Sequence, residues 1–306
     1  MRPGYEWKLA RRSFELGART LVMGVVNVTP DSFSDAGRHF SQESAVQHAL
    51  QLLDEGADIL DIGGESTRPG AKTGEGGVTA AEELGRVLPI IVKVYEQRPS
   101  ALISIDTYKA EVARACVRAG AEVVNDVSAA RWDPEMSRTL AELKCGVVLM
   151  HARGRPEEWR TLPRLSGDAM LELVGRELKE WSAAVIAAGV QREHIVLDPG
   201  FGFGKNFEEN YPLLARLNEL HSLKFPLLAG TSRKSFIGRT LAREQGSAEK
   251  QGSSEKKDAP PDQRLYGTLA AVTAAILRGA HIVRVHDVKP AVEAARVADA
   301  ILVANA

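Results

Sequence analysis

The chain has 306 residues, of which 44% are hydrophobic and 26% charged, and its formal net charge at pH 7 is −1. A charge so near zero gives no global field that attracts nucleic acid or an anionic membrane, so we expect neither as a partner. No apolar run reaches the ~20 residues that span a bilayer, and the N-terminus lacks the apolar core of a signal peptide. We therefore expect a cytoplasmic protein.

Eight short apolar runs, rich in β-branched residues, recur between longer helical stretches. In chain order the predicted strands are Thr20–Val26, Asp58–Ile62, Ala101–Ile105, Glu122–Val124, Gly146–Met150, His194–Leu197, Pro226–Ala229 and His281–Val285. These runs do not alternate cleanly between apolar and polar residues, which is typical of strands buried on both faces.

Amphipathic stretches separate the strands, and each of the clearest ones is followed by a glycine. These stretches are Glu43–Glu55, Lys109–Ala119, Gly167–Ala188 and Leu265–Arg278. The position directly after a helix favours glycine, and repeated helix, glycine and strand indicate β/α units with parallel strands. About eight units predict a single-domain (β/α)₈ TIM barrel over residues 1–306, with an open doubly wound sheet as the alternative. Trp7–Gly17 alternates weakly and predicts a hairpin at the bottom of the barrel.

One segment departs from this alternation. Glu244–Gln263 reads EQGSAEKQGSSEKKDAPPDQ, has no apolar period, and is rich in Ser, Gly, Lys, Glu and Pro. Such a composition predicts a flexible surface loop. We interpret it as a tolerated insertion between two late helices of the barrel.

Polar residues follow the predicted strands, at the ends where the active site of such a barrel lies. In chain order they include Asn27, Asp61, Asp106, Asn125, His151, Asp198, Lys234, Arg284 and His286. Each alone is a weak signal, because a single Asp after a strand is more often a helix N-cap. In a barrel, however, they all face one opening, and such a cluster is costly unless a polar ligand fills it.

These polar residues fall into chemical sets. The first set comprises Asp106, Asn125, Asp198 and Lys234. Its mixture of donors and acceptors suits a flat heterocycle with N–H and C=O edges. The second set comprises Arg68, Arg284 and His286. Its cationic or titratable groups suit phosphate or carboxylate oxygens, and Asn27 offers a neutral oxygen for Mg²⁺ when phosphates supply the other ligands.

Seven runs of the sequence together resemble one family. They are NVTPDSFSD (Asn27–Asp35), DIGGESTRPGA (Asp61–Ala71), SIDT (Ser104–Thr107), NDVS (Asn125–Ser128), LDPGFGFGK (Leu197–Lys205), GTSRKSFIG (Gly230–Gly238) and RVHDV (Arg284–Val288). Taken in order, they resemble the dihydropteroate synthases. The resemblance implies a (β/α)₈ barrel that condenses (7,8-dihydropterin-6-yl)methyl diphosphate with p-aminobenzoate, giving 7,8-dihydropteroate and pyrophosphate in folate biosynthesis.

The resemblance also implies roles for single residues. For the pterin these are Asp106, Asn125, Asp198 and Lys234. For the diphosphate they are Asn27 with Mg²⁺, Thr67, Arg68, Arg284 and His286. For the p-aminobenzoate pocket they are Phe33, Thr67, Pro69, Phe203, Lys234 and Ser235. The residues expected to act in catalysis are Asp106, Lys234, Arg284 and His286.

The implied reaction needs no protein nucleophile, because the aryl amine attacks. We expect dissociative, SN1-like substitution, in which Asp106 stabilises the developing pterin cation and Mg²⁺ with the cationic residues stabilises pyrophosphate. The protonation state of His286 stays open. Two alternatives are a pterin-binding methyltetrahydrofolate methyltransferase domain and a non-catalytic pterin-binding module. The family is commonly homodimeric through late helices, so we expect a homodimer, and the pocket residues predict sensitivity to sulfonamides.

Overall fold

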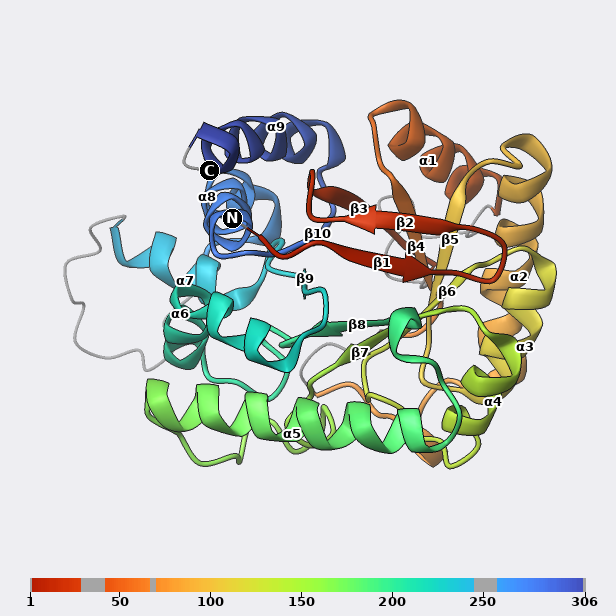
Figure 1. Cartoon of the computed structure of the whole chain (residues 1–306), viewed down its shortest axis with the longest axis horizontal. Helices are drawn as coiled ribbons and strands as arrows, with labels where there is room; N and C mark the ends of the chain where they lie inside the picture. The colour runs from red at the N-terminus through yellow and green to blue at the C-terminus, as the bar shows by residue number, and fades with distance from the viewer. Residues whose placement is uncertain (1, 29–41, 67–69, 245–257, 305–306) are drawn as a thin grey trace.

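Eight parallel strands alternate with helices along the chain and form one continuous sheet (Figure 1). The computed structural model describes residues 2–28, 42–66, 70–244 and 258–304. Within those ranges, no helix combines the length and the apolar character that crossing a membrane requires.

The strands begin and end within two residues of the predicted runs. They are β3 (Leu21–Asn27), β4 (Ile59–Gly63), β5 (Leu102–Asp106), β6 (Val123–Asp126), β7 (Gly146–Met150), β8 (Ile195–Asp198), β9 (Leu228–Ala229) and β10 (Ile282–Val285). Their order in the sheet is β8-β7-β6-β5-β4-β3-β10-β9. A parallel bridge joins Leu197 on β8 to Leu227, the residue before β9, and Leu197 N–H donates to the Pro226 carbonyl (3.0 Å). This contact closes the ring, so the barrel is confirmed and the open sheet is rejected.

Helices surround the barrel. They are α1 (Gln42–Asp54), α2 (Ala80–Gln97), α3 (Ala110–Ala119), α4 (Met136–Leu143), α5 (Gly167–Ala187), α6 (Phe207–Ala215), α7 (Ser235–Glu244), α8 (Leu265–Leu277) and α9 (Val288–Ala304). Short 3₁₀ helices are η2 (Gly74–Gly76), η3 (Arg192–His194), η4 (Leu217–Leu223) and η5 (Pro261–Arg264). The four glycines predicted to end helices all have positive φ, between +96° and +129°. Such backbone conformations favour glycine, so these helix ends are confirmed.

Residues on the barrel strands alternate between two cores. Outward-facing residues such as Leu60, Ile103 and Val147 pack with the helices in the main hydrophobic cluster. Inward-facing residues near the N-terminal ends of the strands form a second cluster, made of Leu21, Met23, Ile59, Leu102, Val123, Val148, Val196, Leu228 and Ile282. Further along the same strands, the inward positions carry polar groups, because side chains two residues apart share a face.

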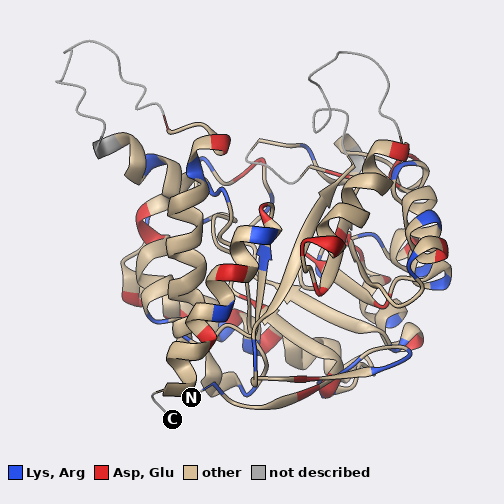
Figure 2. Ribbon diagram, turned by 90° about the horizontal axis from the view of Figure 1, so that it is seen from above, with Lys and Arg blue, Asp and Glu red and all other residues tan. Residues whose placement is uncertain are grey.

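The predicted N-terminal hairpin is confirmed and lies across the bottom of the barrel (Figures 1 and 2). Its strands are β1 (Tyr5–Lys8) and β2 (Ser13–Leu16), which pair antiparallel. Trp7 is fully buried in the inward-facing cluster, and its Nε1–H donates to the His194 carbonyl (2.9 Å). The hairpin therefore seals the end of the barrel opposite to the C-terminal strand ends.

The predicted flexible segment Glu244–Gln263 has a different boundary at its C-terminal side. Glu244 ends α7, and residues 245–257 lie outside the described residues. Arg239 Nε donates to Asp258 Oδ1 (3.0 Å), and Ala259 N–H donates to a carbonyl of α7 (3.0 Å). Because 3₁₀ helix η5 follows at once, the chain from Asp258 onward is part of the packed fold, which corrects the predicted end of the loop.

Candidate active site

One row of residues crosses four adjacent strands at their C-terminal ends. Asn27 pairs in register with Gly63, Gly63 with Asp106, and Asp106 with Asn125. Gly63 has no side chain, and a Cβ placed there would lie 3.2 Å from Asp106 Cβ. The glycine therefore leaves room for the Asp106 side chain, and the row brings together three of the predicted site residues.

Arg284 on β10 connects this row to a carboxylate one layer deeper in the barrel. Its Nε donates to Asp61 Oδ2 (2.6 Å), and its Nη2 donates to Asp106 Oδ2 (2.7 Å). Asn125 Nδ2 donates to the same Asp61 oxygen (2.9 Å). Burial opposes the charge of Arg284, but the two carboxylates outweigh it and raise the pKa of the guanidinium. Two charge-assisted bonds thus fix the plane of a cation at the barrel opening.

Asp61 is a site residue to which the sequence reasoning gave no role. It is fully buried on β4 and lies two residues after the inward-facing Ile59. Its Oδ1 has no hydrogen-bond partner among the described residues. The signal was its position, because a carboxylate within an apolar strand requires a buried partner.

The ends of β8 and β9 supply the other half of the site. Asp198 Oδ1 accepts a hydrogen bond from Gly200 N–H (2.7 Å), which does not use Oδ2. Lys234 Nζ lies 3.9 Å from the centroid of the Phe203 ring and interacts electrostatically with Asp198. The structure therefore brings together these three predicted residues, whereas Ser235 begins α7 and is exposed.

Burial shifts the titration of the charged groups towards their neutral forms. It raises the pKa of Asp106 to about 7, although Arg284 opposes the shift, and it raises the pKa of Asp198 to about 6. Burial, and then the nearby Arg284, lower the pKa of Lys234 to about 7. Acidic and basic groups are thus both buried where desolvation makes their charged forms unfavourable. Such perturbed groups mark a functional site, because a ligand of complementary charge relieves the cost.

His286 follows β10 and is oriented by a neighbouring loop. Ser232 Oγ lies 3.0 Å from His286 Nδ1 and accepts a hydrogen bond from His286 N–H (3.2 Å). Next to it, Arg233 donates twice to the Asp287 carboxylate, at 3.0 and 2.6 Å. These contacts join the loops after β9 and β10. They hold His286, the residue predicted to bind the diphosphate, against the loop after β9.

Four predicted site residues, Phe33, Thr67, Arg68 and Pro69, lie outside the described residues. Asn27, the predicted metal ligand, is half-buried in the row of strand-end residues. In the part of the chain that the structure describes, no three His, Cys, Asp or Glu side chains converge to hold a metal ion. Mg²⁺ commonly takes one or two protein ligands and completes its shell with substrate phosphates and water. A single neutral oxygen from Asn27 fits an ion of that kind.

A buried lysine beside the site was also given no role by the sequence reasoning. Lys205 Nζ donates to the carbonyls of Gly200 (2.8 Å) and Phe203 (3.2 Å) and to His151 Nδ1 (2.9 Å). With Lys205 as donor, His151 carries its proton on Nε2 and donates it to Glu177 Oε2 (3.1 Å). Three glycines give this turn positive φ, between +67° and +80°, so the chain wraps around the lysine. A lysine that ends a glycine-rich turn was the signal in the sequence.

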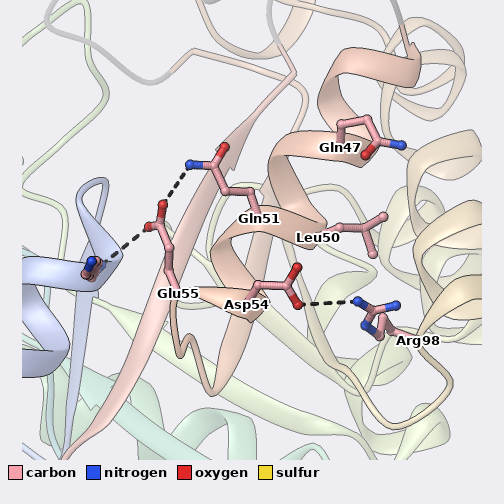
Figure 3. A pocket seen from close by; sticks show the side chains of 7 residues that line it. Gln47, Leu50, Gln51, Asp54, Glu55 and Arg98 are labelled. Carbon is pink, nitrogen blue, oxygen red and sulfur yellow. Dashed lines mark hydrogen bonds and ion pairs between the residues drawn. The ribbon is translucent and has the colours of Figure 1, made fainter.

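A hollow lies on the outer helices, away from the strand ends (Figure 3). Residues of α1 line it together with Arg98 and Lys289. Gln51 Nε2 donates to Glu55 Oε1 (2.7 Å), and Arg98 Nη2 donates to Asp54 Oδ1 (3.3 Å). Because these exposed groups already satisfy one another, the strand ends are the better candidate for an active site.

The barrel and its polar opening define a class of protein, and comparisons with known proteins give the same class. Residues 23–286 match the family described as pterin binding enzyme. The dihydropteroate synthase of Escherichia coli (strain K12) is 45% identical over 284 residues, which cover 93% of this chain and 92% of the relative. That of Bacillus subtilis (strain 168) is 42% identical and covers 93% of this chain and 89% of the relative.

Solved structures agree with these sequence relatives. Xanthomonas albilineans dihydropteroate synthase with 4-aminobenzoic acid is 43% identical, with a TM-score of 0.84 over 98% of this chain and 99% of that chain. The Yersinia pestis dihydropteroate synthase in a sulfonamide drug complex is 39% identical, with a TM-score of 0.84 over 97% and 99%. The chain belongs to the dihydropteroate synthases, within the pterin-binding enzymes, and it is a transferase. This membership argues against the methyltransferase and non-catalytic alternatives.

Proposed function

We propose that the protein condenses (7,8-dihydropterin-6-yl)methyl diphosphate with p-aminobenzoate to give 7,8-dihydropteroate and pyrophosphate. The observation that carries this proposal is the convergence of Asp106, Asn125, Asp198 and Lys234 at one end of the barrel. Two solved structures of the Xanthomonas albilineans dihydropteroate synthase support it, because one holds 4-aminobenzoic acid and the other is in complex with 7,8-dihydropteroate.

The pterin is proposed to bind edge-on to the carboxylate and amide groups. Asp198 Oδ1 is occupied by Gly200 N–H, so Oδ2 is left to accept N–H bonds from the ring. Asn125 uses its Nδ2 on Asp61, so its side-chain oxygen is left as an acceptor. These orientations are set before the ligand arrives, which lowers the cost of binding.

The diphosphate is proposed to lie towards Arg284, His286 and Asn27. Arg284 uses Nε and Nη2 on its two carboxylates, and Nη1 is left for a phosphate oxygen. Thr67 and Arg68 are assigned here by the family resemblance alone. Mg²⁺ held between Asn27 and the diphosphate would supply Lewis-acid stabilisation of the leaving pyrophosphate.

The reaction is proposed to be dissociative. The bond between the pterin methylene carbon and the diphosphate oxygen breaks, and the amine nitrogen of p-aminobenzoate bonds to that carbon and then releases a proton to solvent. The Asp106 carboxylate stabilises the positive charge that develops on the pterin. Arg284 favours the ionised form of that carboxylate and so partly offsets the effect of burial, which raises its pKa to about 7. The chain's part is therefore orientation and electrostatics.

The test is pyrophosphate release that depends on both p-aminobenzoate and Mg²⁺. Asp198→Ala and Lys234→Ala are each expected to lower kcat/KM about 10²–10³-fold, because each removes a preorganised charged group. Asp54→Ala, in the outer hollow, is a control that should retain activity. Wild-type activity in either site variant, with folding verified by thermal unfolding, would show that the site is assigned wrongly.

The p-aminobenzoate pocket is proposed to be the site of sulfonamide inhibition. Its described residues are Phe203, Lys234 and Ser235, and the Yersinia pestis relative was solved with a sulfonamide drug. Sulfamethoxazole should raise the apparent KM for p-aminobenzoate and leave kcat unchanged. An unaffected KM for p-aminobenzoate would contradict this assignment.

We also propose a cytosolic homodimer. Both cysteines are buried free thiols, which fits a reducing compartment. Tyr266 on α8 is 84% exposed, and Val297 and Val303 on α9 are 62% and 69% exposed. Apolar groups so exposed on two adjacent helices favour an interface between subunits. Light scattering tests this, with Val297→Glu expected to shift a dimer towards the monomer.

A further inference from the structure

The loop between β7 and α5 has no role in the function proposed above, yet it contacts the p-aminobenzoate pocket. Trp159 in this loop is 8% exposed, and its Nε1–H donates to the Gly154 carbonyl (3.2 Å). Its ring meets the Phe203 ring nearly at a right angle, with the centroids 5.4 Å apart and 81° between the planes. This edge-to-face geometry is the favoured one for aromatic pairs.

The backbone of Phe203 is held independently of its ring. Arg153 N–H donates to the Phe203 carbonyl (3.4 Å), and Lys205 Nζ donates to the same oxygen (3.2 Å). A Cβ on Gly204 would lie 2.3 Å from the Arg153 carbonyl oxygen, so the two loops approach closely. With the backbone fixed in this way, the side-chain orientation of Phe203 depends on what its ring contacts.

The loop that carries Trp159 is braced from its other side by the connection between β4 and α2. Gly70 N–H donates to the Pro156 carbonyl (3.2 Å), and Arg155 Nη1 donates to Thr73 Oγ1 (3.2 Å). Thr73 is buried, although it belongs to a connecting segment. The loop that carries Trp159 is therefore hydrogen-bonded to a second connecting segment, which limits how far the Trp159 ring can move away from Phe203.

We propose that Trp159 is a positioning residue that determines specificity for the ring of the aryl amine. It holds the Phe203 ring in the orientation in which Lys234 Nζ lies over that ring, and so sets the width of the slot for an unsubstituted benzene ring. This inference rests on the proposed function, which assigns Phe203 to the p-aminobenzoate pocket. Asp106 and Asn125 are proposed to hold the pterin from β5 and β6, away from this aromatic pair, so the larger effect falls on the aryl amine.

Steady-state kinetics of Trp159→Ala and Trp159→Phe test the proposal. Trp159→Ala should raise the KM for p-aminobenzoate about threefold to tenfold, the range expected for loss of one aromatic pair. The KM for the pterin diphosphate and kcat should change less than about twofold. Discrimination against 4-amino-2-hydroxybenzoate, which adds a hydroxyl to the ring, should decrease. Trp159→Phe keeps an aromatic edge and should recover most of the wild-type values.

Trp181→Ala is the matched control, because the Trp181 ring stacks on His151 (5.1 Å, 18°) and lies under the Arg131 guanidinium, and among the described residues it makes no ring contact with Phe203. An unchanged KM for p-aminobenzoate in Trp159→Ala would overturn the inference. So would an equal rise in both KM values, or the same rise in Trp181→Ala. If Trp159→Ala does not fold, Trp159→Leu, which fills the space without an aromatic edge, takes its place, and an unchanged KM for p-aminobenzoate in that variant overturns the inference. Absence of product with the unaltered protein would contradict the proposed function and this inference together, whereas a failure confined to the variants contradicts the inference alone.

Discussion

The two ends of the barrel use the same inward-facing columns of residues for opposite purposes. On β4, Ile59 packs near Trp7 at the bottom, and Asp61 lies two residues further along. On β10, Ile282 and Arg284 repeat this arrangement. Burying apolar groups stabilises the fold, and burying charge costs stability unless the charge is paired. Within the barrel, the inward-facing residues at the N-terminal ends of the strands therefore contribute stability, and those at the C-terminal ends form the candidate active site.

Removing the Trp7 side chain from the bottom of the barrel should lower the stability of the fold without changing the kinetic constants of the active site. Trp7→Ala is expected to lower the free energy of unfolding by about 3–5 kcal/mol, because a large buried ring is lost and a cavity is left. Urea unfolding measures this loss, and both KM values should stay at wild-type levels where the variant is folded. Phe14→Ala, at the half-buried partner of Trp7 on β2, should cost less. A loss of activity without a loss of stability would contradict the comparison.

Changing the deepest carboxylate should have the reverse effect. Asp61→Asn is expected to lower kcat/KM about 10–100-fold, because Arg284 loses one of its two charged partners and its orientation. The free energy of unfolding should change less, since a buried charge is removed together with the bond. Steady-state kinetics and urea unfolding of one preparation measure both quantities. Equal losses of stability in Asp61→Asn and Trp7→Ala would remove the distinction between the two ends.

The cost of a buried charge can be measured at Asp198. Its folded-state pKa is about 6, above the ordinary value of about 3.9 expected in the unfolded chain. The folded state therefore binds the proton more tightly, and stability is lost as the pH rises from about 4 to about 6. Asp198→Asn should remove this penalty and stabilise the protein by about 3 kcal/mol at pH 8. Little difference is expected near pH 4, and a gain independent of pH would contradict the explanation.

The pH profile of kcat/KM should report the ionisation of the buried charged groups at the C-terminal end of the barrel. Activity should rise as Asp198 and Asp106 lose protons, with pKa values of about 6 and about 7. It should fall as Lys234, with a pKa of about 7, loses its charge above that pH. The acid limb should approach about a hundredfold per pH unit below both pKa values, because two groups ionise, and the alkaline limb about tenfold per pH unit. Lys234→Arg should flatten the alkaline limb, because arginine does not titrate there, and an unchanged limb would exclude Lys234 as its cause.

The fold could be predicted well from the sequence, because a barrel repeats one local pattern. Seven of the eight strands are marked in the sequence by apolar runs with β-branched residues, and four helices by a following glycine with positive φ. The N-terminal hairpin was harder to predict, because apolar and polar residues alternate only weakly over Trp7–Gly17. The end of the insertion was missed because Asp258 is held by an ion pair to α7, and no local pattern records such a contact.

The site was predicted in part, and the missing parts share a physical reason. Strand-end residues such as Asp106 and Asn125 were found because barrel geometry brings every strand end to one opening. The partners of Asp61 lie on β6 and β10, and those of Trp159 and Lys205 lie on neighbouring loops. These contacts depend on side-chain packing between distant segments, which periodicity and spacing do not encode.

Arg2 can form its hydrogen bonds only late in the synthesis of the protein, because its partners lie far along the sequence. Arg2 is buried and donates to the Ala280 carbonyl (2.7 Å) and to Asp299 Oδ1 (2.8 Å), across 278 and 297 positions of sequence. Translation adds Asp299 297 residues after Arg2. The N-terminal segment therefore cannot complete these contacts until α9 has been synthesised, so its docking onto the barrel is a late event in folding.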